Sequence, residues 1–595
     1  MKLLIGILLP VWLVQAPAPA PAPAATGSVS GRAVKWGTND ALAEVTVDLV
    51  RVTAPAARTI PPRLTATTGA DGSFTIKNVP AGEYRLYGTL DNGYVPAEYG
   101  QRSPTGVGTS VVLADGQNVT GAILSLTPTA SVSGRITDAN GEPSVFTSLL
   151  AFRIVYKSGG ARKIEIAQSV LTDDRGDYRL FWLPPGKIYI SAMPIETRSY
   201  GLPLSFASRF GGSSYLATPM LGYRMSDTGV LTEETWLPVY FPGTTDIQSA
   251  KPINLHPGEH VDVSMSIASS PTQTYQVRGV ALGDTGQPLP SARLTLVPRR
   301  PDGHSVVLPA SESDMNGEFT IHGVLPGSYY LFLTGPDDPR AVSQVRINGV
   351  SSVSTNILSA TIPIDVAKSN IEGLKVQATP PANITSHVTF DGPAGGAGTP
   401  PRLNVSLVRD PDLQGAPPPV NVPFGFQINS PLNGIGVGDY RVIVSPLPQN
   451  AYVKSMHMGI ADVLNDGLHV AGPTPDTLEI VIGENAGTLN GVLLDDKRQP
   501  SANATIALLP DLARRSRRVD LFRTTSSGAD GTFHFDGLTP GNYKLFAWED
   551  ILSGNWYDPN FMREYENRGM PVRIDEGGAA KPVELTVIPA ERSAP

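Results

Sequence analysis

Residues 71–86 read DGSFTIKNVPAGEYRL, a pattern of alternating apolar residues and two glycine-containing turns. Gly72 supplies the positive φ that a tight turn demands. Phe74 then begins a strand whose alternate residues face inward. Pro80 and Gly82 form the next turn, and the residues after them start the returning strand. The stretch therefore predicts a β-hairpin with one buried face.

The same signature recurs along the chain. Matching stretches lie at residues 176–186, 317–329 and 530–543. In all four copies an aromatic residue precedes the second glycine by eight residues. A degenerate fifth copy at residues 438–444 keeps only the end of the signature. The second glycines stand at positions 82, 186, 327, 438 and 541, so the chain is built from large repeated units.

Each repeat also opens with a strand of alternating apolar residues, such as Val29-Ser30-Gly31 in the first. Alternation with one buried face, repeated about every hundred residues, is typical of a small antiparallel sandwich. We therefore predict an all-β chain, a tandem array of five antiparallel β-sandwich domains, called units one to five below. The predicted bounds are 27–128, 129–270 with an aromatic insertion at 197–246, 271–379, 380–485 for a degenerate unit, and 486–595.

The pattern Val-x-Gly…Asp-Gly-x-Phe-x-Ile…Val-Pro-x-Gly-x-Tyr-x-Leu, complete in unit one between Val29 and Leu86, resembles the carboxypeptidase regulatory-like domain. The resemblance covers nearly all of the chain after residue 26, and it is weak in unit four, which lacks the Asp-Gly-x-Phe element. It implies transthyretin-like or Ig-like β-sandwiches, also grouped with carbohydrate-binding-like folds, in a tandem-repeat protein of bacteria. It implies little about function, because such modules accompany many exported proteins.

Residues 1–26 are predicted to be a signal peptide and an Ala-Pro spacer. Lys2 precedes an apolar run from Leu3 to Val14, which is too short to span a bilayer comfortably, and Ala-Pro repeats follow. Retention as an uncleaved anchor is the alternative, and no other stretch could span a membrane. The chain has no cysteine, which favours a bacterial envelope protein over a eukaryotic secreted one. We expect export to the periplasm, the outer-membrane surface or the extracellular space.

One motif suggests zinc chemistry. His256-Pro-Gly-Glu-His260 has the spacing of an inverted zincin, which requires a helix to place both histidines on one face. Pro257 and Gly258 would break that helix, and the repeat places the motif at the turn before a last strand. Asp71 and the other aspartates of the Asp-Gly turns lack the alternating carboxylates of a calcium loop. We therefore predict no metal site, no cofactor and no catalytic residue. A zinc peptidase is the less favoured alternative.

Aromatic residues in loops of units two and five are the candidate binding residues. They are Trp236, Tyr240, Phe241, Trp548, Trp556 and Tyr557. Exposed aromatics stack on sugars or anchor a protein partner. The alternative is that they cover an open sandwich edge or join neighbouring units.

The predicted function is a non-enzymatic binding, adhesion or spacer array in the bacterial envelope. The alternative is a carbohydrate-binding protein that uses these loops. The partner would be a polysaccharide or another envelope protein. A net charge of -8 without a basic stripe argues against nucleic acid.

Overall fold

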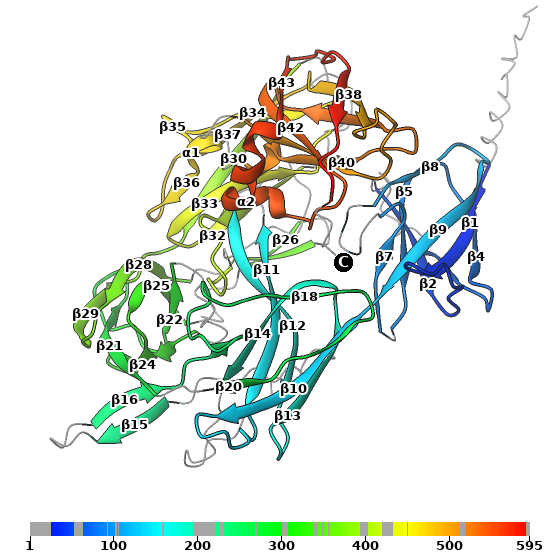
Figure 1. Cartoon of the computed structure of the whole chain (residues 1–595). Coiled ribbons are helices and arrows are strands. Elements are labelled where there is room, and N and C mark those ends of the chain that lie inside the picture. The colour runs from blue at the N-terminus through cyan, green and yellow to red at the C-terminus, as the bar shows by residue number, and fades with distance from the viewer. Residues whose placement is uncertain are drawn as a thin grey trace, which may run out of the picture.

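A computed structural model describes residues 25–590, apart from 53–62, 92, 102–103, 105, 107, 158–159, 194–220, 226–230, 268–270, 300–307, 337–342, 348–349, 355–356, 393–402, 419–431, 449 and 512–517. The predicted signal peptide and most of its spacer lie outside these residues. The described part is a β-sandwich repeat protein, and it is all-β apart from a few short helices (Figure 1). None of its helices is long and apolar enough to cross a bilayer.

Unit one contains two sheets that face each other. One has the order β4-β1-β9-β6, and the other has the order β3-β2-β5-β7 with β8 also paired to β5. The strands are β1 (Gly27–Lys35), β2 (Thr46–Arg51), β3 (Leu64–Thr67), β4 (Ser73–Val79), β5 (Gly82–Thr89), β6 (Tyr94–Val95), β7 (Ala97–Glu98), β8 (Val111–Leu113) and β9 (Asn118–Pro128).

Unit two has a sheet β13-β10-β19, in which β20 also pairs with β10, and a sheet β12-β11-β14-β17, in which β18 also pairs with β14. Its strands are β10 (Ala130–Asp138), β11 (Ser148–Lys157), β12 (Ala161–Leu171), β13 (Asp177–Leu183), β14 (Gly186–Met193), β17 (Val239–Tyr240), β18 (Ile253–Leu255), β19 (His260–Asp262) and β20 (Met265–Ile267).

Unit three has a sheet β15-β16-β21-β24 with β29 also on β21, a sheet β23-β22-β25-β28, and the hairpin β26-β27. The strands are β15 (Leu221–Met225), β16 (Leu231–Thr235), β21 (Thr272–Leu282), β22 (Arg293–Pro298), β23 (Ala310–Glu312), β24 (Glu318–Val324), β25 (Gly327–Thr334), β26 (Ser343–Ile347), β27 (Val350–Ser354), β28 (Ser359–Val366) and β29 (Ile371–Gln377).

Unit four has the sheets β32-β30-β37-β34-β35 and β31-β33-β36, and unit five has the sheets β41-β38-β44 and β40-β39-β42-β43. The elements of unit four are β30 (Ala382–Asp391), β31 (Asn404–Arg409), β32 (Leu432–Ile435), β33 (Gly438–Ser445), β34 (Tyr452–Met458), β35 (Ala461–Asp462), α1 (Val463–Asp466), β36 (Leu468–Val470) and β37 (Thr477–Gly483). Those of unit five are β38 (Gly487–Leu494), β39 (Thr505–Pro510), η3 (Val519–Leu521), β40 (Arg523–Ser526), β41 (Thr532–Leu538), β42 (Gly541–Trp548), η4 (Asn555–Tyr557), α2 (Pro559–Tyr565), η5 (Glu566–Arg568), β43 (Met570–Ile574) and β44 (Val583–Thr586).

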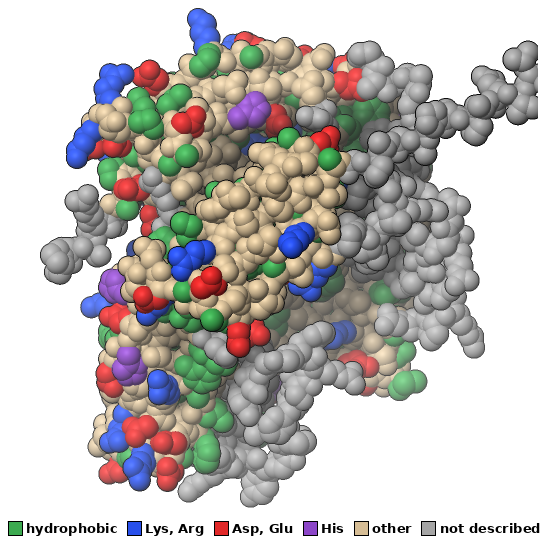
Figure 2. Space-filling model, turned by 90° about the vertical axis from the view of Figure 1, so that its right-hand side faces the viewer, with side chains coloured by type: hydrophobic (Ala, Val, Ile, Leu, Met, Phe, Trp, Pro, Cys, Tyr) green, Lys and Arg blue, Asp and Glu red, His purple; other side chains and the backbone are tan. Residues whose placement is uncertain are grey.

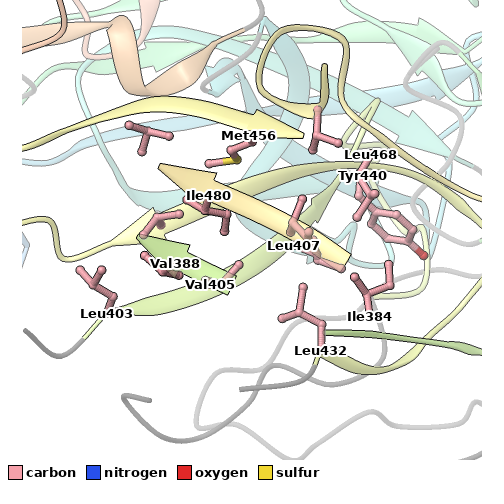
Figure 3. Packing of buried hydrophobic residues seen from close by; sticks show 14 of the residues in the cluster. Ile384, Val388, Leu403, Val405, Leu407, Leu432, Tyr440, Met456, Leu468 and Ile480 are labelled. Carbon is pink, nitrogen blue, oxygen red and sulfur yellow. The ribbon is translucent and has the colours of Figure 1, made fainter. Parts of the chain in front are cut away.

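Large clusters of buried side chains lie between the paired sheets. Among the described residues they draw on 29–126, 130–267, 275–378, 382–482 and 489–587. Figure 3 shows the fourth, where side chains such as Ile384, Leu407, Tyr440 and Ile480 converge from different strands. Unit four thus has a core of the same kind as the others, although its match to the signature is the weakest.

The first and last strands of each unit run parallel, whereas most other neighbouring strands are antiparallel. The parallel pairs are β1 with β9, β10 with β19 and β20, β21 with β29, β30 with β37, and β38 with β44. This pairing explains the Val-x-Gly of the opening strand. A Cβ on Gly31 or Gly279 would overlap the carbonyl oxygen of the last strand, at Ala122 or Leu374 respectively. Glycine permits this close approach of two backbones.

The tyrosine of the signature closes the Pro-Gly turn with its hydroxyl. Tyr84 donates to the carbonyl oxygen of Pro80 over 2.8 Å, and Tyr329 to that of Leu325 over 2.9 Å. Tyr440 and Tyr543 make the same bond to the residue four positions earlier. The arrangement is similar to the tyrosine corner of Ig-type sandwiches. Unit two has Ile188 at this position and lacks the bond.

The insertion predicted for unit two contributes strands to unit three. Strand β16 pairs with the beginning of β21, and β15 forms the sheet edge beyond it (Figure 1). Glu233 of β16 is buried, and its carboxylate accepts bonds from Gln276, from His322 Nδ1 at 2.6 Å and from the Gly323 N–H at 3.2 Å. All three donors belong to unit three, so this described part of the insertion is held by the next unit's sheet.

Contacts also join units that are distant in the sequence. Lys163 Nζ in unit two lies 2.6 Å from Asp412 Oδ2 in unit four, and the Gln414 amide bonds both backbone groups of Ile164. The hydroxyls of Thr109 in unit one and Ser526 in unit five are 3.1 Å apart. The units therefore pack back on one another, and not only against their neighbours in sequence (Figure 1).

Candidate functional site

Three of the six candidate loop aromatics are buried. Trp548 is 2% exposed, Trp556 6% and Tyr240 0%, so their rings are not open to a ligand. Trp236, Phe241 and Tyr557 are partly buried. This distribution fits the interpretation that the loops cover an open side of a sandwich.

In unit five the loop after β42 forms a second core on the outer face of the sheet. Residues alternate along β42, so Tyr543 and Leu545 point into the main core while Phe546 and Trp548 point outward. The loop returns over them, and Tyr565 of α2 packs edge-on against Trp548 with ring centroids 5.8 Å apart. Burial of these large rings makes the loop part of the fold.

Unit two repeats this arrangement on a smaller scale. Tyr240 packs against Phe152 of β11, with ring centroids 6.1 Å apart, and Ile247 completes the cluster. Trp236 precedes this cluster and is partly buried. The predicted insertion residues 197–220 and 226–230 lie outside the described part of the chain.

The zinc-like motif is a turn between β18 and β19. His256 Nδ1 lies 2.9 Å from Glu259 Oε2, and both side chains are well exposed. Hydrogen bonds from His256, first from its backbone N–H and then from its ring, lower the pKa of Glu259. His260 contacts Ser131 and Ser133 instead. Across the described residues, no group of three or more His, Cys, Asp or Glu side chains is placed to hold a metal ion.

The aspartates of the repeated turns act as hydrogen-bond acceptors. Asp71 Oδ1 accepts from the backbone N–H and the hydroxyl of Ser73, at 3.0 and 2.7 Å. Asp530 makes the same pair of bonds with Thr532. These bonds, led by the one from the hydroxyl, lower the pKa of each aspartate. The carboxylates therefore serve the turn itself.

A polar face with an exposed aromatic end lies on the outer side of the sheet β13-β10-β19. Buried residues alternate along β13 and β10, so the residues between them point outward. The strand registers place these outward residues in rows. One row joins Arg179, Ser133 and Asp262, and another begins with Asp177 opposite Arg135.

The rows are tied together by hydrogen bonds. His260 lies between two serines, with Nδ1 2.9 Å from the Ser131 hydroxyl and Nε2 3.1 Å from that of Ser133. The guanidinium of Arg135 donates two hydrogen bonds, of 2.7 and 3.1 Å, to the carboxylate of Asp177. The bond from the guanidinium lowers the pKa of Asp177 and raises that of Arg135. Arg135 and Asp177 thus neutralise each other, while Arg179 and Asp262 lie on either side of Ser133.

A shallow depression of about 760 Å³ opens at one end of the face. It lies where the last strand breaks between β19 and β20, and its lining includes Arg135, Asp177, Asp262 and Ser264. Tyr178 lies beneath it and donates its hydroxyl to the carbonyl oxygen of Val263 over 2.6 Å. Burial raises the pKa of Tyr178, so its phenol stays protonated.

Phe181 and Trp182 occupy the other end of the face. They are 41% and 58% exposed, and their rings meet edge to face with centroids 4.9 Å apart. The candidates named from the sequence omit both residues. The alternation of the strand contains the signal, because Tyr178 and Leu180 point inward and Phe181 must therefore point outward. The loops are the more conspicuous candidates because they contain more aromatic residues than this strand.

No protein-family model matches the chain, and no characterised protein sequence matches it. Solved structures of β-sandwich proteins align with it. The TIE protein of Bacillus anthracis aligns over 96% of this chain and 76% of its own, with 10% identity and a TM-score of 0.14.

The minor pilin GBS52 of Streptococcus agalactiae aligns over 42% of this chain and 98% of its own, with 12% identity and a TM-score of 0.22. A putative carbohydrate binding protein of Pseudomonas aeruginosa aligns over 18% and 88%, with 14% identity and a TM-score of 0.13. At such scores the functions of these proteins are not transferred to this chain.

Proposed function

We propose that the chain is an exported, non-enzymatic protein of the bacterial envelope, in which five β-sandwich units of the carboxypeptidase regulatory-like type form a binding or adhesion array. The unit bounds are those predicted from the repeat, and residues 1–26 direct export. The observation that carries this proposal is the set of contacts between distant units, such as Lys163 with Asp412 and Thr109 with Ser526. These contacts favour a compact binding body over an extended spacer.

The roles of the polar groups support a non-catalytic protein. Each group that first suggested chemistry has a local structural partner: His256 bonds Glu259, and Asp71 and Asp530 cap their own turns. On the face shown in Figure 2, acidic and basic side chains are interspersed and hydrophobic side chains form small groups. Such a surface suits a neutral or mixed partner better than nucleic acid.

The second candidate is carbohydrate binding through the aromatic loops. Of the six loop aromatics, Trp236, Phe241 and Tyr557 keep partly exposed side chains, so a ligand would have to contact these three. Trp236→Ala tests this candidate, since loss of polysaccharide retention with an unchanged melting temperature would support it.

Two measurements on the full chain test the main proposal. Cell fractionation after expression in a bacterium should place the chain outside the cytoplasm, and Leu9→Arg in the apolar run should keep it inside. Immobilised protein should then retain a component of a detergent-solubilised envelope extract or a polysaccharide. Cytoplasmic wild-type protein, or peptide hydrolysis that depends on added zinc and on His256, would contradict the proposal.

A further inference from the structure

We propose that the outer face of β13-β10-β19 in unit two binds a neutral polysaccharide, with Trp182 and Phe181 stacking against its sugar rings. This inference rests on the binding function proposed above and names the site and the ligand class. It differs from the loop hypothesis, because none of the loop aromatics lies on this face.

The backbone at Trp182 is the first observation. Trp182 has φ of 57°, a left-handed conformation that costs a residue other than glycine roughly 1–2 kcal/mol. Every unit has a residue with positive φ at this place, four positions before the second glycine of the signature. The others are Asn78, Gly323, Gly434 and Gly537, residues that tolerate this conformation. Only unit two places a bulky side chain there, against the preference of the backbone.

The presentation of the two rings is the second observation. The Phe181 N–H donates to Gln168 Oε1 over 2.6 Å, which fixes the strand end. One edge of the Trp182 indole lies beside Gly93 of unit one, where an added Cβ would be 3.7 Å from Cδ1 and Nε1. The rest of the indole is open, at 58% exposure. The left-handed backbone at Trp182 costs stability, and the exposed rings of Trp182 and Phe181 contribute little packing in return. Backbone strain kept at such a place indicates ligand binding more than a role in folding.

The polar rows beside the rings indicate the ligand class. The hydroxyls of Ser131 and Ser133 and the ring of His260 both donate and accept hydrogen bonds, as sugar hydroxyls do. Arg135 and Arg179 are matched by two aspartates on the same face, so no excess charge selects a polyanion. A flat face ending in a shallow depression suits an extended chain of neutral sugars.

Affinity electrophoresis of the purified full chain tests the proposal, in native gels containing hydroxyethyl cellulose, xylan, laminarin or dextran. At least one polymer should retard the wild type. Trp182→Gly should weaken that retardation roughly tenfold, and Phe181→Ala should weaken it less. The melting temperature of Trp182→Gly should be unchanged or higher, because glycine accepts the left-handed backbone. Tyr223→Ala, which removes a ring of similar exposure (57%) from β15 in unit three, is the matched control and should keep full retardation.

Each other outcome overturns the site. If wild type and Trp182→Gly are retarded equally, the site is wrong while the proposed binding function stands. If Trp182→Gly melts at a lower temperature and keeps its retardation, the indole serves packing between units one and two. If poly-L-proline in the gel retards the chain through Trp182 and none of the four polymers does, the face binds protein. No retardation by any polymer also overturns it, and the envelope-extract experiment then judges the binding function separately.

Discussion

Units two and three end the same hairpin in opposite ways. In unit three the turn residue is Gly323, and its N–H donates to the buried carboxylate of Glu233 from the preceding unit's insertion. In unit two the equivalent residue is Trp182, which has the same sign of φ and stays 58% exposed. In unit three the hairpin end is covered by β16 from the preceding unit's insertion. In unit two the hairpin end exposes an aromatic ring.

The difference separates what the fold requires from what it permits. Both units need a left-handed residue at the hairpin end, and glycine or asparagine meets that need without strain. At Gly323 a neighbouring segment covers the position and the residue is small. Unit one has the exposed Asn78 there, which tolerates the left-handed backbone. At Trp182 the position is also open, and the chain has a large ring that the hairpin itself does not need. Such an exception to the repeat is an indication of function, because the fold does not require it.

The largest loss of stability is expected on removing the carboxylate of Glu233, which holds β16 over the hairpin end of unit three. Glu233→Ala leaves its three donors without their acceptor and should lower the free energy of unfolding of unit three by about 3 kcal/mol. Chemical denaturation and limited proteolysis after residue 235 would measure the loss and the release of β15 and β16. Glu234→Ala, on the opposite side of β16, is the control and should change stability by less than about 0.5 kcal/mol. Equal effects of the two variants would show that the carboxylate does not hold the hairpin.

Exchanging the turn residue should have the next largest effect. Gly323→Trp places in unit three the residue of unit two, and left-handed strain alone should cost about 1–2 kcal/mol. The added ring would also compete with β16 for its place beside β24. Gly323→Asn, which imitates Asn78 of unit one, should cost clearly less in the same denaturation experiment. A Gly323→Trp protein as stable as the wild type would mean that Trp182 carries no strain either.

A smaller loss of stability is expected on changing Tyr329, the signature tyrosine of unit three, whose place in unit two is taken by Ile188. Tyr329→Phe removes the 2.9 Å hydrogen bond to Leu325 and should destabilise unit three by about 1 kcal/mol. Tyr330→Phe, on the outer face of the same strand, serves as the control and should be nearly neutral in thermal denaturation. If both substitutions are neutral, the hydroxyl does not stabilise the turn.

The smallest effect concerns the acid stability that the Arg135–Asp177 pair gives to unit two. The bond from Arg135 holds the pKa of Asp177 below its ordinary value of 3.8, whereas unit three has Val280 opposite Glu318. A lowered folded-state pKa gives stability that is present above the unfolded pKa and is lost as pH falls through the folded pKa. The melting temperature of Asp177→Asn should therefore lie slightly below that of the wild type at pH 7. The two curves should converge below about pH 3.8; a constant difference would exclude this ion pair as the cause.

Much of the fold could be predicted from the repeat. The Asp-Gly and Pro-Gly turns and the alternation around Phe74 indicate the hairpins, and the all-β class follows from them. The parallel pairing of first and last strands could not be predicted, because alternation has the same period in parallel and antiparallel strands. The pairing of β16 with β21 could not be predicted either, because no local sequence pattern indicates which sheet an inserted hairpin joins.

The candidate site was predicted less well than the fold. Aromatic content favours the loops, yet Trp548 and Tyr240 are buried because they cover outer faces of sheets. Whether a ring is buried depends on what packs over it, which composition does not reveal. At Trp182 the sequence does contain a signal. Aligning the five hairpin ends places this tryptophan among asparagine and glycine residues, so the departure from the repeat lies in the amino-acid sequence itself.

Oxidative footprinting of tryptophan shows whether the open hairpin end of unit two is a binding site. The full chain would be oxidised with and without the polysaccharide that retards it most, and each tryptophan peptide would be quantified by mass spectrometry. We expect rapid oxidation of Trp182 in the free protein and strong protection with the polymer, while Trp236 changes little. Oxidation of Trp182 at the same rate in both conditions would show that this hairpin end is not a binding site.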